Sequence, residues 1–303
     1  MRFAISIPQF TEDGPFDPAA FRAYLARAEA LGFDSAWTQE QLLGTMPALG
    51  PIETLTYAAA CTERLRLGCA VFVTPLHSPL HLAKSIASLD QLSGGRLEVG
   101  VGTGGRGRLF AAFGVDPEGL VTRFTEGLAL MKACWTEPRV TFAGRFWQLE
   151  DVAMEPKPVQ RPHPPVWFGA NHPNALRRAV RHGDGFFGAG STTAGRFAEQ
   201  VQVVRDALAE QGRDPAGFGI AKRVYIAVDD DAARGARDID AALERLYGRT
   251  GLAPVAVSGP PEACAEALRE VAEAGAGTIL LNPLFGEAAQ LERLAGEVIP
   301  ALA

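Results

Sequence analysis

Short apolar runs alternate along the chain with longer amphipathic segments. The first run, residues 3–7, is rich in β-branched and aromatic side chains, which favours a strand. Asp17 and Pro18 follow as a helix N-cap and a proline in the first helical turn. Apolar residues then recur at helical spacing, at Phe21, Leu25, Ala28 and Leu31. Because Gly32 comes next and glycine commonly ends a helix, this region predicts a strand followed by a helix.

The same alternation continues to the end of the chain. It predicts eight strands, at residues 3–7, 34–38, 66–72, 97–101, 166–169, 185–188, 219–228 and 277–281. It predicts helices at residues 18–31, 51–62, 78–93, 121–135, 173–182, 194–211, 232–247, 260–274 and 287–298. Since crossover helices return the chain in the same direction, consecutive strands should pair in parallel. Eight such units in 303 residues predict an α/β fold, the closed (β/α)8 TIM barrel. A doubly wound open sheet is the alternative.

One stretch, about 136–165, interrupts this pattern before the fifth strand. Residues 139–142 and 145–149 read as a small β-hairpin, and residues 156–165 carry five prolines. A segment so rich in proline cannot be helical and should run extended. A domain linker is one interpretation, but we expect an insertion within a single domain that covers residues 1–303.

Composition narrows the class of protein. The chain is 47% hydrophobic and 21% charged, which excludes wholesale disorder and fibrous repeats. Its net charge of −6 argues against a nucleic-acid partner. The N-terminal apolar run is too short for a signal peptide and no run reaches membrane-spanning length, so we expect a cytoplasmic protein with no membrane partner. The four cysteines, which form no C-x-x-C pair, fit a reduced compartment; they are Cys61, Cys69, Cys134 and Cys264.

In a barrel of this type the active site lies at the C-terminal ends of the strands. The glycine-rich segment 100–105 follows the fourth strand and matches G-x-G-x-x-G. It does not open a helix directly, so it is a weak dinucleotide fingerprint. Its glycines still let a ligand approach the backbone, and Arg106 and Arg108 offer cationic partners for a phosphate or carboxylate. A flexible surface loop with solvated arginines is the alternative.

Two further strand ends carry candidate chemistry. Gly169, Ala170 and Asn171 precede a helix that begins near Pro173, and free N–H groups at a helix start can bind an anion. An ordinary turn capped by Asn171 is the alternative. Glu40 ends the second strand, where a carboxylate can act as acid or base or bind a ligand, unless it is simply solvated.

Metal binding has little support in the sequence. His77 and His81 are four residues apart, but Pro79 lies between them and should begin the helix, which leaves His77 outside it. No third ligand has matching spacing, so we predict no metal. Residues 229–231 are three aspartates that suit a helix N-terminus, and they lack the alternating ligands of a calcium loop.

Seven segments, in a fixed order within residues 3–285, carry a family resemblance. They are Ala28–Trp37, Thr62–Gly68, Leu89–Leu97, Gly100–Gly104, Arg123–Glu126, Pro164–Gly169 and Asp184–Phe186. Together they resemble the bacterial luciferase-like family of flavin- and deazaflavin-dependent oxidoreductases. The resemblance implies a (β/α)8 barrel with a flavin-type ring at its C-terminal mouth. It also implies a backbone bulge on the third strand near Ala70 and Val71, often with a non-proline cis peptide, and a homodimer.

The resemblance assigns residues to the site. It implies cofactor contacts at Ala70, Val71, Thr74, Gly102, Thr103, Gly104, Arg106, Gly169, Ala170, Asn171 and Gly188. With the insertion, the substrate pocket would be lined by Phe10, Trp37, Phe72 and His77. The phosphate contacts of the family map onto residues 104–106 and 169–171, which agrees with the anion site inferred above.

One departure from the family pattern affects the chemistry. Many members carry Asp-His or Glu-His at the end of the second strand, whereas this chain has Glu40 and Gln41. Glutamine cannot act as a base near neutral pH, so alcohol oxidation through that histidine is in doubt. We expect Glu40 and Gln41 to be the catalytic residues, with Gln41 donating a hydrogen bond to substrate or cofactor.

The leading functional hypothesis is an oxidoreductase that uses a reduced deazaflavin coenzyme of the F-420 type to transfer hydride to or from a small organic substrate. The second is an FMN-dependent monooxygenase that uses O2 and reduced flavin from a partner flavin reductase. The third is a non-catalytic flavin-binding barrel. A non-redox lyase would need a catalytic lysine, and the lysines considered are assigned mostly to helices or loops; they are Lys84, Lys132, Lys157 and Lys222.

Overall fold

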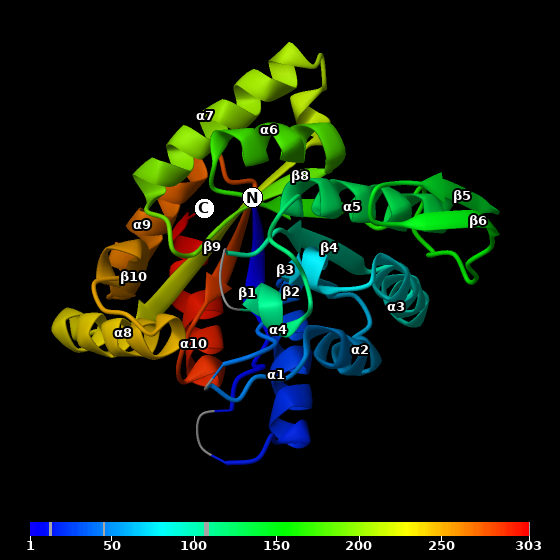
Figure 1. Ribbon diagram of the computed structural model, residues 1–303. Coiled ribbons are helices and arrows are strands. Elements are labelled where there is room, and N and C mark those ends of the chain that lie inside the picture. Colours follow the sequence, from blue (N-terminus) through cyan, green and yellow to red (C-terminus); the bar gives the residue numbers. More distant parts are fainter. Residues whose placement is uncertain (12–13, 45, 106–108, 303) are drawn as a thin grey trace.

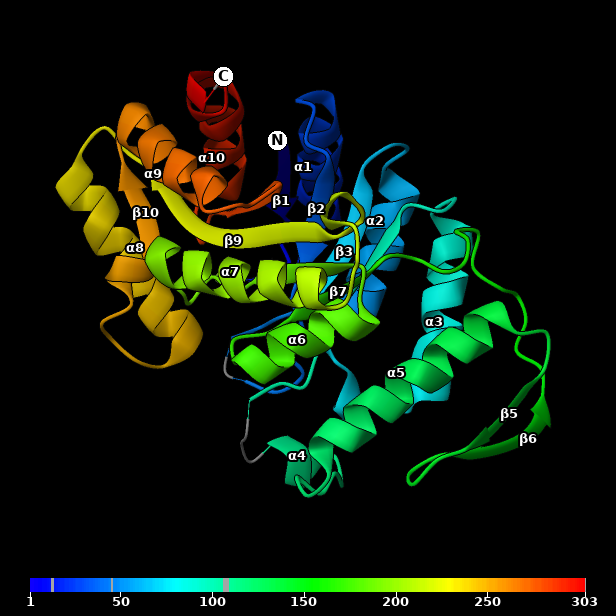
Figure 2. The same cartoon turned by 90° about the horizontal axis from the view of Figure 1, so that it is seen from above.

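The computed structural model describes residues 1–11, 14–44, 46–105 and 109–302. Eight parallel strands close a barrel (Figures 1 and 2). They are β1 (Arg2–Ser6), β2 (Ser35–Thr38), β3 (Arg66–Val73), β4 (Leu97–Gly102), β7 (Val166–Gly169), β8 (Gly185–Gly188), β9 (Gly219–Val228) and β11 (Thr278–Asn282). Each pairs in parallel with the next, β8 pairs with β9, and β11 returns to β1. The predicted (β/α)8 barrel is confirmed, and each predicted strand lies within two residues of its observed bounds.

Helices cover the outside of the barrel. They are α1 (Pro18–Ala30), α2 (Pro51–Cys61), α3 (Pro79–Leu92), α5 (Leu120–Thr136), α6 (Pro173–His182), α7 (Ala194–Glu210), α8 (Ala232–Tyr247), α9 (Pro261–Glu273) and α10 (Glu287–Arg293). A short helix, α4 (Leu109–Ala112), lies in the segment between β4 and α5. The helix starts follow local chemistry, as at α1, where the Asp17 carboxylate accepts hydrogen bonds from the N–H groups of Ala19 and Ala20 at 2.8 and 3.2 Å. The main core lies between these helices and the strands.

Large side chains fill the barrel interior one layer below its mouth. This layer consists of Ala4, Trp37, Trp167, Phe187, Ala221 and Leu280. Three strand glycines make room for the indoles. A Cβ on Gly68 would lie 2.4 Å from Trp37, and a Cβ on Gly185 or Gly219 would lie 2.4 or 2.3 Å from Trp167. Trp37, expected to line a substrate pocket, is therefore packed into this interior layer and is 3% exposed.

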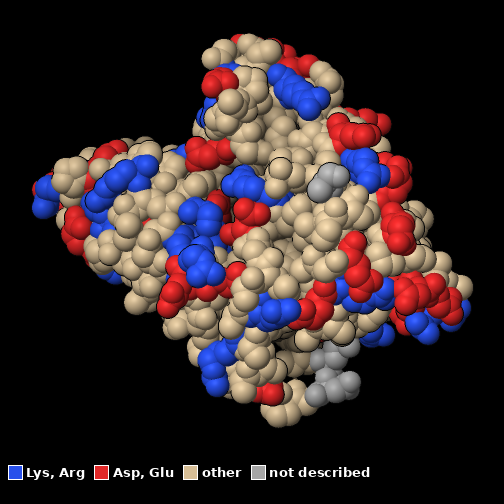
Figure 3. All heavy atoms as spheres, turned by 180° about the vertical axis from the view of Figure 1, so that it is seen from behind, with Lys and Arg blue, Asp and Glu red and all other residues tan. Residues whose placement is uncertain are grey.

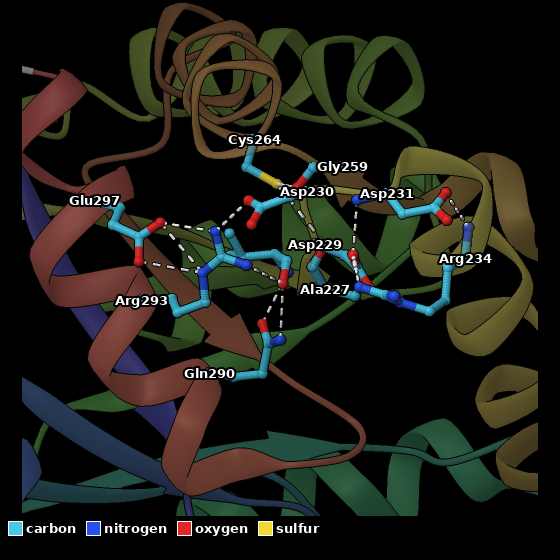
Figure 4. Close-up of polar contacts among 11 residues, drawn as sticks. Ala227, Asp229, Asp230, Asp231, Arg234, Gly259, Cys264, Gln290, Arg293 and Glu297 are labelled. Atoms are coloured by element: carbon cyan, nitrogen blue, oxygen red, sulfur yellow. Dashed lines mark hydrogen bonds and ion pairs between the residues drawn. The ribbon is translucent and has the colours of Figure 1, made fainter.

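The distal half of β9 leaves the barrel and pairs with a strand that was not predicted, β10 (Ala256–Gly259). Four residues with one large apolar side chain give too little pattern to recognise as a strand. On the opposite edge of β9, the side chain of Gln290, which Figure 4 labels, takes the place of a strand neighbour. Its Oε1 accepts from the Val228 N–H at 2.8 Å and its Nε2 donates to the Val228 carbonyl at 3.0 Å.

The three aspartates after β9 lie at the start of α8, as predicted. Asp231 caps the helix by accepting from two backbone N–H groups. Asp229 pairs with Arg234 and Asp230 pairs with Arg293, at 2.6 Å each (Figure 4). Each carboxylate therefore has a structural partner within its own neighbourhood.

The insertion forms the predicted hairpin, β5 (Val140–Ala143) and β6 (Gln148–Val152), which stands outside the barrel beside α5 and α3 (Figures 1 and 2). The Glu126 carboxylate of α5 accepts from three consecutive backbone N–H groups of the hairpin turn at 2.8–2.9 Å. The proline-rich segment returns to β7 and is fastened where Asp90 accepts from the N–H and the amide of Gln160. One domain over residues 1–303 stays a prediction.

Figure 3 shows acidic and basic side chains intermixed over the face opposite to that of Figure 1. In the part of the chain that the structure describes, no helix combines the length and apolar character needed to cross a membrane.

Candidate functional site at the barrel mouth

A cavity of about 440 Å³ opens at the C-terminal ends of β3, β4, β7, β8 and β9. Its walls are formed by Ala70, Val71, Gly102, Thr103, Gly104, Gly105, Gly169, Ala170, Asn171, His172, Ala175, Phe187, Gly188, Ala189, Gly190, Arg223, Tyr225 and Tyr247. Nine of the eleven expected cofactor residues are among them. The two others are Thr74, which lies elsewhere, and Arg106, which is outside the described residues, as is Arg108.

A bulge on β3 forms the centre of this mouth. The pairing of β3 with β4 shifts register between Cys69 and Phe72, and the Ala70–Val71 peptide bond is cis, so both predicted features of this strand are confirmed. The Val71 side chain lies between two glycines, because a Cβ on Gly102 or Gly169 would approach its methyl groups to 2.6 or 2.8 Å. Glycine is therefore required at both positions for this close packing.

A second hollow of about 280 Å³ adjoins the cavity. Its lining consists of Gln39, Glu40, Gln41, Ala70, Val71, Val73, Arg223, Tyr225, Leu246 and Tyr247. Because five of these residues also line the cavity, the bulge lies where the two spaces meet. This arrangement suits a larger ligand in the cavity and a smaller one beside it.

Arg223 was not predicted as a site residue. It is 8% exposed, and its guanidinium donates to the Gln39 side-chain oxygen, to the Ala70 carbonyl at 2.9 Å and to the Thr38 carbonyl at 3.5 Å. Gln39 is itself fixed by Gln9, whose amide accepts from the Gln39 N–H at 2.6 Å and donates to its carbonyl at 2.8 Å. The sequence signal for a functional residue here was two adjacent cationic residues inside the apolar run 219–228.

The other half of that pair, Lys222, is 2% exposed and lies on β9, within the strand predicted at residues 219–228. Its ammonium donates to the Ala189 carbonyl at 2.6 Å and to the Arg223 carbonyl at 2.8 Å. Burial, and then the charge of Arg223, lowers the pKa of Lys222 to about 7. Lys222 thus holds the loop 188–190 in place from the side away from the cavity, and this loop forms one wall of the cavity.

Glu40 is held more tightly than a solvated loop residue. Its carboxylate is 1% exposed; Oε2 accepts from the Val73 N–H at 2.6 Å, and Oε1 lies 2.8 Å from Nε2 of His77. Both oxygens are thus engaged, and they anchor β3 just beyond the bulge. Gln41 lines the second hollow beside Glu40. The catalytic roles of Glu40 and Gln41 stay predictions.

Several expected site residues do not reach the cavity. Phe72 is fully buried in the outer core, because the bulge reverses the inward and outward alternation of β3. Thr74 lies with His77 in a void of about 10 Å³ under the hairpin. Phe10 and Trp37 line a separate hollow of about 30 Å³ that Arg223 also reaches.

The start of α6 differs from the expected anion site. His172, and not Asn171, is the N-cap: its Nδ1 accepts from the Asn174 N–H at 3.2 Å, and its carbonyl accepts from Ala175 at 2.8 Å. The backbone N–H groups of Asn174 and Ala175 are therefore already bound within the helix start. Asn171 lines the cavity with its side-chain oxygen bound to the Gln200 amide at 3.1 Å, which leaves its own amide N–H groups as donors.

The sequence profile of a family described as luciferase-like monooxygenase matches residues 1–253. The chain is 31% identical to an F420-dependent glucose-6-phosphate dehydrogenase of Beutenbergia cavernae, over 95% of this chain and 94% of that protein. It is 32% identical to an FMNH(2)-dependent dimethylsulfone monooxygenase of Pseudomonas putida, over 61% of this chain and 52% of that protein. With the first curated relatives, the chain spans about half of their length.

Among solved structures, the monooxygenase RslO1 from Streptomyces bottropensis is similar over 100% of both chains, with a TM-score of 0.85 and 26% sequence identity.

Proposed function

Because the chain belongs to the luciferase-like monooxygenase family, a family of oxidoreductases, we propose that it binds a flavin-type coenzyme in the glycine-walled cavity and acts on a small organic substrate in the adjoining hollow. We further propose that the coenzyme is a reduced deazaflavin of the F-420 type. The observation that carries the proposal is the convergence of nine expected contact residues on one cavity around the β3 bulge.

The residues present fit such a coenzyme. The cavity wall is largely glycine and alanine backbone, which a planar ring can approach closely. Ala70 and Val71 would support the ring, while the segments 102–105 and 169–172 would contact its tail. The chemistry that a reduced deazaflavin supplies when bound is the transfer of two electrons as hydride.

The side chains of the chain would do the remaining work. Glu40 and His77 hold the strand that carries the bulge, so they position the ring support. Gln41 can donate a hydrogen bond to a substrate carbonyl without exchanging a proton. Burial, then the neighbouring Tyr225, raises the pKa of Tyr247, which keeps its hydroxyl protonated. Tyr247 and Leu246 also line the second hollow and help to exclude water from it.

A second candidate is an FMN-dependent monooxygenase that would use O2 and a partner flavin reductase. It is favoured by the likeness to the dimethylsulfone monooxygenase and to RslO1. Both candidates place the coenzyme in the same cavity and differ in its chemistry. The homodimer and the cytoplasmic location of the sequence analysis stay predictions.

Coenzyme binding tests the two candidates against each other. Purified chain is titrated with F-420 and with FMN while coenzyme fluorescence is recorded. We expect the deazaflavin to bind about tenfold more tightly or better. Micromolar binding of FMN with none of the deazaflavin contradicts the leading proposal and favours the monooxygenase.

A single-turnover experiment addresses the non-catalytic alternative. Reduced coenzyme bound to the chain is mixed anaerobically with a panel of organic acceptors, and reoxidation is followed by absorbance. We expect at least one acceptor to accelerate reoxidation. The Gln41→Ala variant should lower that rate and leave coenzyme affinity unchanged, whereas an unchanged rate would remove Gln41 from the chemistry.

A further inference from the structure

The mouth contains a buried positive charge without a carboxylate partner. None of the ion pairs among the described residues includes Arg223. Its three acceptors are an amide oxygen and two backbone carbonyls, all neutral. A buried charge is costly unless it is paired, so this guanidinium is prepared for an anion that a ligand brings.

The position of Arg223 indicates which space that anion enters. Arg223 lines the cavity and the second hollow alike, and it is the only lysine or arginine among the described residues that line the hollow. Glu40, the one carboxylate in that lining, has both oxygens bound to His77 and Val73. Among the described residues that line the hollow, no carboxylate is therefore left to pair with this positive charge.

The remaining lining of the hollow sets the other half of the ligand. Val71, Val73 and Leu246 offer apolar contacts. Tyr225 and Tyr247 share a hydrogen bond of 2.8 Å between their hydroxyls, so they present partly apolar rings on the same wall. A ligand that matches this surface has one anionic end and one short apolar end.

We infer that Arg223 recognises a carboxylate or similar oxyanion of the substrate, and that the substrate is a small organic acid whose apolar part lies against Val71, Val73 and Leu246. This inference rests on the proposed function, since it names the substrate class of the same site. The guanidinium supplies charge-assisted hydrogen bonds from the N–H groups that the protein leaves free. Its contacts to Gln39 and Ala70 keep it at the point where bulge and hollow meet.

The test compares acids with their uncharged analogues. Linear carboxylates from acetate to octanoate, and the matching primary amides, are titrated into the full chain by calorimetry, with and without F-420 or FMN. We expect the best carboxylate to bind about 10- to 100-fold more tightly than its amide. Equal affinities, or no carboxylate binding up to about 10 mM, overturn the inference.

Variants assign the preference to one side chain. Arg223→Gln keeps donors for the neutral acceptors and should reduce the preference for acid over amide to about twofold or less. Arg223→Lys should retain part of the preference for acid over amide. The matched control, Arg196→Gln, removes the same charge from an exposed arginine that pairs with Glu199 and should leave the preference unchanged. A preference that persists in Arg223→Gln contradicts the inference.

Coenzyme titrations separate this result from failure of the proposed function. If neither coenzyme binds while carboxylates bind through Arg223, the proposed function fails and the inference stands. If Arg223→Gln loses coenzyme affinity and the wild type shows no preference for acids, the guanidinium serves the coenzyme and the inference fails. Circular dichroism checks the fold of each variant. If Arg223→Gln does not fold, the wild type and Arg223→Lys decide the question. A complete loss of the preference for acids in Arg223→Lys contradicts recognition by charge.

Discussion

The two ends of the barrel treat polar groups in opposite ways. At the N-terminal end, the Glu29 carboxylate accepts from the N–H groups of Glu63, Arg64 and Leu65, and thereby fixes the loop that enters β3. At the C-terminal mouth, glycine loops surround a cavity, and Arg223 has only neutral acceptors. One end is saturated with internal bonds, and the other keeps donors for a ligand.

Arg96 is the clearest member of the saturated end. Its guanidinium makes five hydrogen bonds at 2.7–3.0 Å that join the loop before β4 to the end of α2; the acceptors are Ser93 O, Thr62 Oγ1, Leu65 O, Ala59 O and Thr62 O. Glu29 and Arg96 both lie in segments that carry the family resemblance. Those segments therefore specify the barrel more than they specify its substrate, in keeping with the division of stability and activity between the two ends of such barrels.

The largest effect on this comparison should come from Arg96→Ala. The variant leaves four backbone carbonyls and one hydroxyl without their donor, so the free energy of unfolding should fall by about 2–4 kcal/mol. Urea unfolding followed by circular dichroism measures this loss. Arg177→Ala, which breaks an exposed pair with Glu210, is the control and should cost under about 1 kcal/mol. Equal losses in the two variants would remove the contrast between the ends.

Gly102→Ala should act on the mouth instead. A Cβ there would lie 2.6 Å from Val71, so the bulge must shift, and coenzyme affinity should fall about 10- to 100-fold. Gly195→Ala is the control, since a Cβ at Gly195 meets no atom within 4 Å. Fluorescence titration with F-420 and FMN measures the affinity. Wild-type affinity in Gly102→Ala would show that the bulge does not support the ligand.

Glu29→Gln should weaken the saturated end by a smaller amount. The loss of charge from a carboxylate that binds three N–H groups should cost about 1–2 kcal/mol near pH 7. Burial raises the pKa of Glu29, but the backbone hydrogen bonds outweigh it and the net pKa is lowered. A carboxylate whose pKa is lower in the folded state stabilises the fold at pH values above its unfolded pKa. The stability advantage of the wild type over Glu29→Gln should therefore shrink as the pH falls below about 4.5. Unfolding free energies of both proteins between pH 7 and 3 measure this, and a constant difference would contradict it.

The smallest expected effect concerns Lys222, behind the mouth. Its pKa of about 7 in the folded chain lies below that of an unfolded lysine, so the unfolded state binds more protons between pH 7 and about 10. Stability should therefore rise by about 1 kcal/mol from pH 7 to 8, and Lys222→Met should lack this rise. Parallel urea titrations at the two pH values check the slope; a wild type whose stability rises no more than that of Lys222→Met over this interval would show that Lys222 is charged in the fold.

Much of the fold could be predicted because its signals are local. Asp17 caps α1 as expected, Pro79 begins α3 and leaves His77 outside it, and the strand at Gly219–Val228 has its predicted bounds. The strand β10 escaped because pairing with β9, rather than its own pattern, makes it a strand.

The site was less accessible to sequence reasoning. The cavity residues were found through the family resemblance and the rule that strand ends carry the chemistry. Phe72 was misplaced because one extra residue at the bulge turns every later side chain of β3 to the other face. Arg223 was missed because its local sequence shows a charge within an apolar strand but does not show that this charge meets Gln39 and Ala70 at the mouth.

The sequence by itself determined the eight strand–helix units, the cap of α1, the insertion and the membership of a family, because each depends on neighbours within a few turns of chain or on an ordered set of motifs. Only the tertiary structure decided which groups meet. Glu40 finds His77 and the Val73 N–H more than thirty residues away, and Arg223 reaches Gln39 across 184 positions. Such contacts are fixed by closure of the barrel, which brings together strand ends that the linear pattern keeps apart.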